Sequence, residues 1–300
     1  WHCHGIETVE TLLEAYDAFQ KMKGGRPHLR LDAAETLKAV PGLSAEGLVG
    51  SVAFDEWVTE AVGLVEANLG SALRHGAEVR CGAPATGLLV SEGRVAGVLT
   101  ESGPIGARVV INASGPWVAR TAKWAGASIG VTLRKGSHLV YDRRLFPIGL
   151  IMQAPAAITP QGGDRVVFVI PLAGRTHVGP TDLPGPPDPD DTVSDPDEAS
   201  WILDSVRPYF AKFPADYHRV MVGSRPILDA GGDEKLLSRG FEVFDHEARD
   251  GVAGLVTVGG GKMSDFRLMA EAATDLVCRK LGVDAPCRTH LETLSGQPVA

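Results

Sequence analysis

The sequence predicts a mixed α/β protein, with strand–turn–helix units towards both ends and a more antiparallel sheet between them. Two compact apolar segments, 108–113 and 255–258, predict the end units, because each runs through a turn of small residues into a helical pattern. The segments 166–171 and 176–179 predict the middle, because they flank the turn residues Ala173 and Gly174 as the strands of a hairpin do.

Apolar residues at helical spacing predict two helices in the first part of the chain. One covers 8–22, and the other covers 58–75 and ends at Gly76. Their apolar faces comprise Val9, Leu12, Leu13, Tyr16 and Phe19 in the first helix and Val58, Val62, Val65, Leu69 and Leu73 in the second. A short strand is expected at 78–81, and then a hairpin in which 88–90 and 95–100 flank the turn at 92–94.

The segment 184–198 is rich in proline and acidic residues and is predicted to be an exposed loop, because it can bury little apolar surface. A helix is expected after it, with Trp201, Ile202, Val206 and Tyr209 on its buried side. The last helix is expected to be capped by Ser264 and to end at Gly282. Its predicted buried side comprises Phe266, Met269, Ala270, Ala273, Leu276 and Val277.

The composition of the 300-residue chain, with 44% hydrophobic and 22% charged residues, is ordinary for a globular protein. A formal net charge of −8 argues against a nucleic-acid-binding protein that works through a broad basic face. No apolar run is long enough to span a membrane and no signal peptide is recognisable, so a cytoplasmic protein is expected. The four cysteines form no Cys-x-x-Cys pair, which argues against a zinc or iron–sulfur site. The chain starts at Trp1 rather than Met, and we interpret it as a fragment.

The turn Gly259-Gly260-Gly261-Lys262 allows three interpretations. A phosphate-binding P-loop needs G-x-x-x-x-G-K-[ST], but Val256 and Met263 occupy two of its fixed positions. A dinucleotide fingerprint needs G-x-G-x-x-G, but Ser264 stands at the third glycine and too few residues follow to complete a doubly wound sheet. The third interpretation is a turn whose glycines let the backbone approach a flat ligand, at the N-terminus of the next helix. A plain strand–helix turn remains an equal alternative.

The segment Asn112-Ala113-Ser114-Gly115-Pro116-Trp117 is a second turn of small residues between a strand and a helix. Taken alone, it fits a tight packing corner as well as it fits a ligand site. Two such turns, far apart in the sequence, favour a ligand that both of them contact.

Several segments, in this order, resemble the FAD-dependent glycerol-3-phosphate dehydrogenases. The family patterns are V-x-N-A-[TS]-G-P-W at 110–117, K-G-S-H at 135–138, P-x-x-G-R-T…G-T-T-D at 171–182, G-[VS]-R-P ending at Pro226, and G-G-K-[LM]-x-[TS]-[YF]-R-x-M-A-E at 260–271. The resemblance covers roughly residues 30–290, and its specificity lies in the order and spacing of the segments. The block from Asp245 to Cys287 looks closest to the large subunit of the anaerobic, quinone-linked form.

The resemblance implies the glutathione-reductase-like fold of the D-amino-acid oxidase group, with an FAD-binding domain and an antiparallel-sheet substrate domain. It assigns 58–125 and 250–283 to the FAD-binding domain and 126–249 to the substrate domain. It assigns 1–57 to a helical cap part of the substrate domain and 284–300 to a tail. The family's first βαβ unit, with its G-x-G-x-x-G, has no counterpart before Trp1, so the fold is expected to be incomplete. We therefore expect this chain neither to bind FAD tightly nor to turn over.

The activity that the resemblance implies is oxidation of sn-glycerol 3-phosphate, a small phosphorylated polyol, to dihydroxyacetone phosphate. Hydride passes to FAD, and the electrons pass on to a quinone or an electron-acceptor subunit. Family members that reduce quinones are usually peripheral on the cytoplasmic face. The expected location is therefore the cytoplasm or the inner face of the cell membrane.

Carried over residue by residue, the catalytic roles of the family fall on Arg225 and Lys262. Arg225 would bind the phosphate as a planar fork, and Lys262 would hold a substrate oxygen near the flavin. A surface ion pair for Arg225 and a solvated lysine for Lys262 are the alternatives. The residues expected to contact FAD are Ala85, Ala113, Ser114, Gly115, Trp117, Gly260, Gly261, Met263 and Ser264. The lone histidines His138 and His177 are expected to be structural.

Asp265 departs from the family pattern, because it places a carboxylate near the expected phosphate site. It favours an alternative in which the same flavoprotein fold oxidises an amine, an amino acid or a 2-hydroxy acid. If Asp265 points away from the phosphate site and stabilises the start of the next helix, the glycerol-3-phosphate interpretation holds. A third alternative is a non-catalytic remnant or interaction module, which the missing nucleotide-binding segment motivates.

Overall fold

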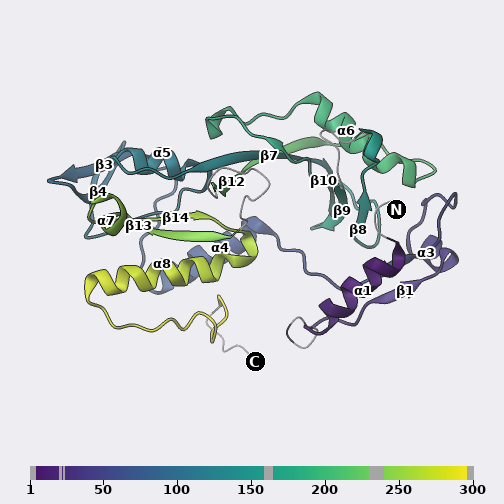
Figure 1. Ribbon diagram of the computed structural model, residues 1–300, viewed down its shortest axis with the longest axis horizontal. Helices are drawn as coiled ribbons and strands as arrows, with labels where there is room; N and C mark the ends of the chain where they lie inside the picture. The colour runs from purple at the N-terminus through teal and green to yellow at the C-terminus, as the bar shows by residue number, and fades with distance from the viewer. Residues whose placement is uncertain (1–4, 20–21, 23, 159–164, 230–239, 296–300) are drawn as a thin grey trace. The chain divides into compact units, whose positions relative to one another are not determined.

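The computed structural model describes residues 5–19, 22, 24–158, 165–229 and 240–295 (Figure 1). The chain divides into two compact units. Unit 1 comprises 1–60, 136–182 and 193–223, and unit 2 comprises 61–135, 183–192 and 224–300. Three segments that were predicted to lie in the substrate domain, 126–135, 183–192 and 224–249, therefore belong to unit 2. Which unit binds cofactor and which binds substrate remains a prediction.

Unit 1 contains an antiparallel sheet with a helix packed on it. Its strands are the second half of β7 (Val131–Tyr141), then β10 (Arg175–Gly179), β9 (Val166–Leu172) and β8 (Leu150–Gln153), in that spatial order. The predicted β9–β10 hairpin is confirmed, and its turn residues Ala173 and Gly174 both have positive φ, at 49° and 79°. Two positive φ values are the signature of the tight turn that matches strand twist.

Helix α6 (Pro196–Val206) completes the core of unit 1. Asp195 and Glu198 form a capping box at its start, and Pro196 occupies its first position. Ile202 and Val206 are fully buried, as predicted, against core residues Leu139, Tyr141, Phe146, Val167, Val169, Val178, Phe210 and Phe213. The predicted loop 184–198 is thus a loop up to Asp195, with the short elements β11 (Leu183–Pro184) and η3 (Pro189–Asp191) in it.

The N-terminal part of unit 1 contains α1 (Ile6–Asp17), β1 (Leu29–Leu31), α3 (Ala33–Ala39) and β2 (Ser51–Ala53). The first predicted helix is confirmed, but it ends at Asp17 rather than at residue 22. Its apolar face is not buried, since Leu12 is 65% exposed. Two short 3-10 turns, η2 (Ala156–Ile158) and η4 (Arg207–Tyr209), complete the unit.

Unit 2 contains two three-stranded sheets. One has the order β13 (Phe241–Asp245), β14 (Leu255–Gly260), β6 (Val110–Asn112), and the other has the order β3 (Ala85–Ser91), β4 (Arg94–Thr100), β5 (Gly103–Gly106). Only the β6–β14 pair is parallel within these sheets. Buried Leu88, Val95, Val110, Ala122, Ala127, Ile129, Phe244 and Leu255 form the core between the strands and the short helices α5 (Val118–Lys123) and α7 (His246–Asp250).

Several sequence predictions for unit 2 are confirmed and others are wrong. The β3–β4 hairpin is confirmed, with Glu92 and Gly93 at φ 50° and 74°. Helix α4 (Ala61–Arg74) lies within the predicted range, but its apolar stripe is exposed, with Val62 at 63%. The strand predicted at 78–81 is wrong, because no described segment pairs with it and an isolated extended segment has no hydrogen-bond ladder.

The final helix, α8 (Phe266–Leu281), ends before Gly282 as predicted, with Gly282 in the left-handed conformation at φ 65°. The prediction that Ser264 caps it is wrong. Asp265 occupies the N-cap position, no side chain makes a capping bond, and Ser264 lies in the 3-10 turn η6 (Met263–Asp265). Of its six predicted buried residues, Ala273 alone is fully buried, whereas Phe266 remains 38% exposed.

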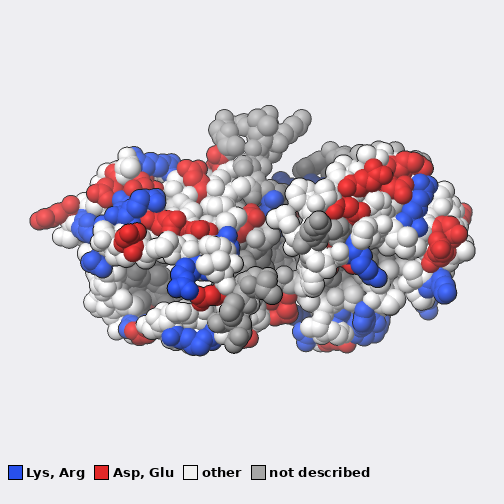
Figure 2. Space-filling view, turned by 90° about the horizontal axis from the view of Figure 1, so that it is seen from below, with Lys and Arg blue, Asp and Glu red and all other residues white. Residues whose placement is uncertain are grey.

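The described surface carries interspersed charges. Figure 2 shows acidic and basic side chains side by side on one face of the molecule. None of the described helices is both long enough and apolar enough to cross a membrane.

Candidate functional site

The parallel strands β6 and β14 bring the two small-residue turns to one edge of a sheet. Asn112, the last residue of β6, lies opposite Thr257 of β14, 145 residues further along the chain. Because parallel strands run the same way, the turns that follow them leave at the same edge. These turns are the segments 113–117 and 259–262, and the carboxyl edge of such strands is where open α/β sheets bind ligands.

The turn after β6 presents its backbone. Ala113 is exposed, and Gly115 has φ +58°, with no atom within 4 Å of the position that a Cβ would occupy. The Ser114 hydroxyl faces inward instead, because it donates to Oδ1 of Asn112 at 2.7 Å and lies 3.1 Å from Oγ1 of Thr121. The predicted ligand residue Ser114 therefore supports the turn with its side chain and with its main chain, because its N–H donates to Oδ1 of Asn112 at 3.4 Å and its carbonyl oxygen accepts from the N–H of Trp117 at 3.1 Å.

The glycines after β14 are required by the chain itself. Gly260 and Gly261 have φ +69° and +86°, and a Cβ on Gly260 would lie 2.6 Å from the carbonyl oxygen of Gly240. Close packing thus explains why side chains are excluded, as in the alternative of a plain turn. The residues that follow, Met263 and Ser264, are exposed and reachable by a ligand, with Met263 at 52%.

Lys262 and Arg225 differ in their surroundings. Lys262 is exposed, and within the described chain its ammonium group has no hydrogen bond or ion pair. Arg225 is half-buried on β12 (Arg219–Leu228). The last residue of that strand, Leu228, lies 3.1 Å from the position of a Cβ on Gly260, so the strand that carries Arg225 ends against the glycine turn.

Comparison with known proteins identifies the family. Residues 1–279 match the DAO family, described as FAD dependent oxidoreductase. The chain belongs to this family. It is 30% identical to the aerobic glycerol-3-phosphate dehydrogenase of Bacillus subtilis over 97% of this chain and 54% of that protein. The chain thus spans about half the length of the curated relatives it matches.

Solved structures agree with the predicted FAD-binding fold. The glycerol-3-phosphate dehydrogenase of Bacillus halodurans complexed with FAD superimposes with a TM-score of 0.73 at 26% identity, over 87% of this chain and 51% of that one. Glycine oxidase of Bacillus cereus shares the fold alone, with a TM-score of 0.63 at 18% identity over 97% and 72% of the two chains. The predicted resemblance and the FAD dependence of the family are confirmed. The Bacillus subtilis relative is named an aerobic enzyme, so the likeness to the anaerobic form remains a prediction.

For the cofactor of this family, the turn after β6 leaves room at its backbone, whereas the glycines after β14 pack against Leu228, Gly240 and Met269. The open position beside Gly115 admits a flat ring or a ribityl chain that a Cβ would obstruct. All of the predicted cofactor residues belong to unit 2, as do both predicted catalytic residues. Ala85 is the exposed first residue of β3 and pairs with Thr100, at the end of the hairpin opposite the bridge between Arg94 and Ala253.

Trp117 uses the polar atom of its side chain within the protein. Its Nε1 donates to Oδ1 of Asp190 at 2.8 Å, and Nη1 of Arg120 donates to the other carboxylate oxygen at 2.8 Å. Arg120, followed by Trp117, lowers the pKa of the Asp190 carboxyl. Only the ring of Trp117, which is 36% exposed, is therefore available to a cofactor in this flavoprotein.

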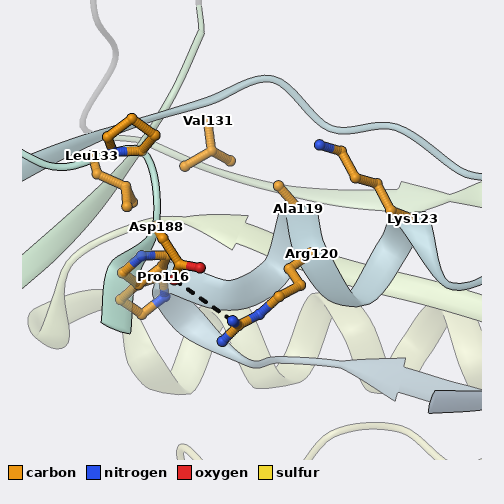
Figure 3. A pocket seen from close by; sticks show the side chains of 9 residues that line it. Pro116, Ala119, Arg120, Lys123, Val131, Leu133 and Asp188 are labelled. Carbon is orange, nitrogen blue, oxygen red and sulfur yellow. Dashed lines mark ion pairs between the residues drawn. The ribbon is translucent and has the colours of Figure 1, made fainter. Parts of the chain in front are cut away.

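A shallow depression of about 310 Å³ adjoins this cluster on α5. Figure 3 shows Arg120 directed at Asp188, with Lys123, one turn further along α5, directed away from this pair. Asp188 and Asp190 of the 183–192 loop thus neutralise the charge of Arg120. The predicted site residues do not line the depression, which is formed by Pro116, Ala119, Arg120, Lys123, Val131, Leu133, Pro187, Asp188 and Pro189.

The two histidines expected to be structural lie on the sheet of unit 1. His138 is on β7 and His177 is on β10. Burial, followed by the charges of Arg219 and Arg175, lowers the pKa of His177. A neutral, half-buried imidazole on a strand agrees with the structural interpretation.

Sequence reasoning missed a set of buried polar residues behind the first turn. Asn112 is 3% exposed, and Thr257 and His246 are fully buried. Nε2 of His246 lies 2.9 Å from Oγ1 of Thr257, and Nδ1 lies 2.5 Å from Oδ2 of Asp250. The sequence signal that could have revealed this set is one polar residue in each of two apolar strands, Asn112 in β6 and Thr257 in β14.

Proposed function

We propose that this chain provides part of the cofactor site and the substrate-binding cations of an FAD-dependent sn-glycerol-3-phosphate dehydrogenase. The product would be dihydroxyacetone phosphate, and the electrons would pass to a quinone or another acceptor. The observation that carries the proposal is the parallel β6–β14 pair, which places both turns at one sheet edge in a chain 30% identical to enzymes of that name. The quinone and a peripheral position on the inner face of the cell membrane rest on the resemblance alone.

In this proposal the backbone at 113–115 and 260–261 holds FAD, beside the side chains of Met263, Ser264 and Trp117. FAD, when bound, supplies a hydride acceptor for C2 of the substrate. The protein contributes orientation and electrostatics. The missing Cβ at Gly115 lets the main chain come close to the cofactor, whereas Gly260 is required by packing against Gly240 and Leu228.

Lys262 is assigned to a substrate oxygen, where its charge stabilises negative charge that develops during oxidation. An ammonium that the described chain leaves unpaired is suited to an anionic ligand. Arg225 is assigned to the phosphate, because its planar guanidinium can bind two phosphate oxygens together. The oxidation also releases the proton of the C2 hydroxyl group, and this proton passes to solvent because no side chain is assigned as the base.

Dye reduction with a panel of substrates tests the proposal. Because the 300 residues by themselves are expected neither to bind FAD tightly nor to turn over, this and the following experiments use the protein as its cell produces it. It is mixed with FAD, and reduction of an artificial acceptor is followed with sn-glycerol 3-phosphate, glycerol, glycine, L-proline and a 2-hydroxy acid. We expect reduction with the phosphate ester alone, and a KM at least about tenfold higher in Arg225→Lys, which keeps the charge but loses the fork.

Other outcomes of this experiment separate the alternatives. Reduction by an amine or amino acid, and not by the phosphate ester, would replace the proposal with the oxidase alternative. The Asp265 carboxylate would then bind the amino group of the substrate. Bound flavin without reduction by any compound would support the non-catalytic module.

A further inference from the structure

A series of hydrogen bonds runs through the interior of unit 2 from α7 to the turn after β6. It starts at the Asp250 carboxylate, 2.5 Å from Nδ1 of His246, and continues from Nε2 to Oγ1 of Thr257 at 2.9 Å. Nδ2 of Asn112 then donates to Oγ1 of Thr257 at 3.2 Å. One assignment of donors and acceptors satisfies every bond in the series with a neutral imidazole.

In this assignment the carboxylate oxygen of Asp250 accepts, and Nδ1 of His246 carries the proton that is donated to it. Thr257 already accepts a hydrogen bond from Asn112, and its own hydroxyl proton is available for Nε2. His246 is therefore an acceptor on the side of Thr257, and both of its ring nitrogens have a partner.

Asn112 connects the series to the 113–117 turn through two further hydrogen bonds. Its amide nitrogen also donates to the carbonyl oxygen of Val118 at 2.9 Å, and its amide oxygen accepts from the hydroxyl of Ser114 at 2.7 Å. The two bonds span the turn from both sides. The carbonyl oxygen of Val118 can only accept, so the bond to it requires Nδ2 of Asn112 on that side, and a Thr257 oxygen whose proton is directed at Nε2 of His246 accepts from Asn112 in the same orientation.

We propose that His246 is a positioning residue, which acts through Thr257 and Asn112 to preform the backbone of the 113–117 turn for FAD. This inference rests on the proposed cofactor site. It assigns a role to the Asp245-His246-Glu247 segment, in which His246 contacts neither the turn nor its ligand directly. Loss of either partner is expected to be costly, because His246 and Thr257 are both 0% exposed and water cannot replace a missing partner.

Two substitutions at His246 separate its two bonds. His246→Asn places an amide nitrogen near the position of Nδ1, which keeps the bond to Asp250 and removes the one to Thr257. His246→Gln reaches towards the position of Nε2, which keeps an acceptor for Thr257 and removes the bond to Asp250. Thr257→Val removes the hydroxyl, and Thr257→Ser keeps it. Thr36→Val is the matched control, because Thr36 is a buried threonine of unit 1 that donates to Asp32.

Two measurements are made on each variant. Hydrogen exchange of the peptide 113–118 is measured without FAD, and the dissociation constant of FAD is measured by flavin fluorescence. We expect His246→Asn and Thr257→Val to accelerate exchange at 113–118 about tenfold more than elsewhere in unit 2, and to weaken FAD binding about tenfold, the loss of one buried hydrogen bond. His246→Gln, Thr257→Ser and Thr36→Val should change both quantities less than about threefold.

The inference is overturned if exchange at 113–118 changes no more than in the rest of unit 2, or if His246→Gln behaves as His246→Asn does. Should His246→Asn not fold, the comparison of Thr257→Val with Thr257→Ser decides by the same criterion. Wild-type protein that binds no FAD would contradict the proposed function. Selective loss of protection at 113–118 in the same preparation would still support the positioning role.

Discussion

Asn112 and Thr257 are neighbours across a parallel strand pair and are joined by a side-chain hydrogen bond of 3.2 Å, although 145 residues separate them. This relationship fixes the register of β6 on β14. It therefore also fixes which residues of the two following turns face each other along the sheet edge. Polar pairing in the interior favours one register, because a shift by one residue would break the buried bond between Asn112 and Thr257.

We expect Asn112→Asp to lower the free energy of unfolding by about 3 kcal/mol or more, since it sets a buried carboxylate against the Val118 carbonyl oxygen. Urea unfolding measures the change. Asn68→Asp is the matched control, because the amide of Asn68 donates to the carbonyl oxygen of Leu64 from a half-buried position on α4. A loss no larger than that of the control would show that the Asn112 bonds do not stabilise unit 2.

Gly115 and Gly260, one glycine from each turn, should respond differently to substitution by alanine. At Gly115 only the positive φ resists a side chain, and we expect Gly115→Ala to cost about 1 kcal/mol. At Gly260 the new Cβ would also meet the Gly240 carbonyl oxygen at 2.6 Å, and we expect about 3 kcal/mol. Equal losses in chemical unfolding would contradict the packing described at β14.

Lys262→Met should leave the free energy of unfolding within about 0.5 kcal/mol of the wild type, because the side chain is exposed. In the proposed dehydrogenase it should reduce kcat/KM for sn-glycerol 3-phosphate about 100-fold, as expected for loss of one group that stabilises developing charge. Lys123→Met, at an exposed lysine on α5, is the control and should change neither quantity. An unchanged kcat/KM in Lys262→Met would support the alternative that Lys262 is a solvated lysine without a catalytic role.

The ion pair between Asp245 and Lys280, at 2.7 Å, should give unit 2 a stability that depends on acid pH. Partial burial opposes ionisation of Asp245, but the Lys280 ammonium and the backbone N–H groups of Glu247 and Ala248 together lower the pKa of that carboxyl. A carboxyl with a lowered pKa in the folded state stabilises the fold above its unfolded value of about 3.9, and the stabilisation is lost as the pH falls below it.

Lys280→Met should therefore be less stable than the wild type by about 1 kcal/mol at pH 7, and the difference should shrink below about pH 4. Urea unfolding across this range measures it. Arg279→Met, at the exposed neighbouring position, is the control. A difference that stays constant down to about pH 2 would assign the loss to packing of the lysine stem.

Local sequence signals predicted the parts of this fold that short segments determine. The turn pairs Glu92-Gly93 and Ala173-Gly174 mark both hairpins through their glycines, because glycine adopts a positive φ readily, whereas Glu92 and Ala173 adopt one although few residues of their kind do. Apolar spacing predicted α4 and α8 as helices, but it does not say what covers an apolar face, and Val62 and Phe266 are exposed. The strand expected at 78–81 failed for a related reason, since a strand needs a partner as well as a suitable sequence.

The candidate site was predictable only in part. The two glycine-containing turns are visible in the sequence as strand–helix junctions. The hydrogen bonds that hold them are not, because Asn112, His246 and Thr257 belong to segments whose register depends on long-range pairing. Ser114 illustrates the difference, since its hydroxyl supports the turn rather than facing a ligand.

Hydrogen exchange of the wild-type protein with and without FAD tests most directly whether the β6 and β14 turns form one cofactor site. We predict that FAD slows exchange in the peptides 112–118 and 258–264 together, with the same FAD concentration giving half of the effect in each. Protection of only one peptide, or of neither in protein that retains flavin, would contradict a shared site at this sheet edge.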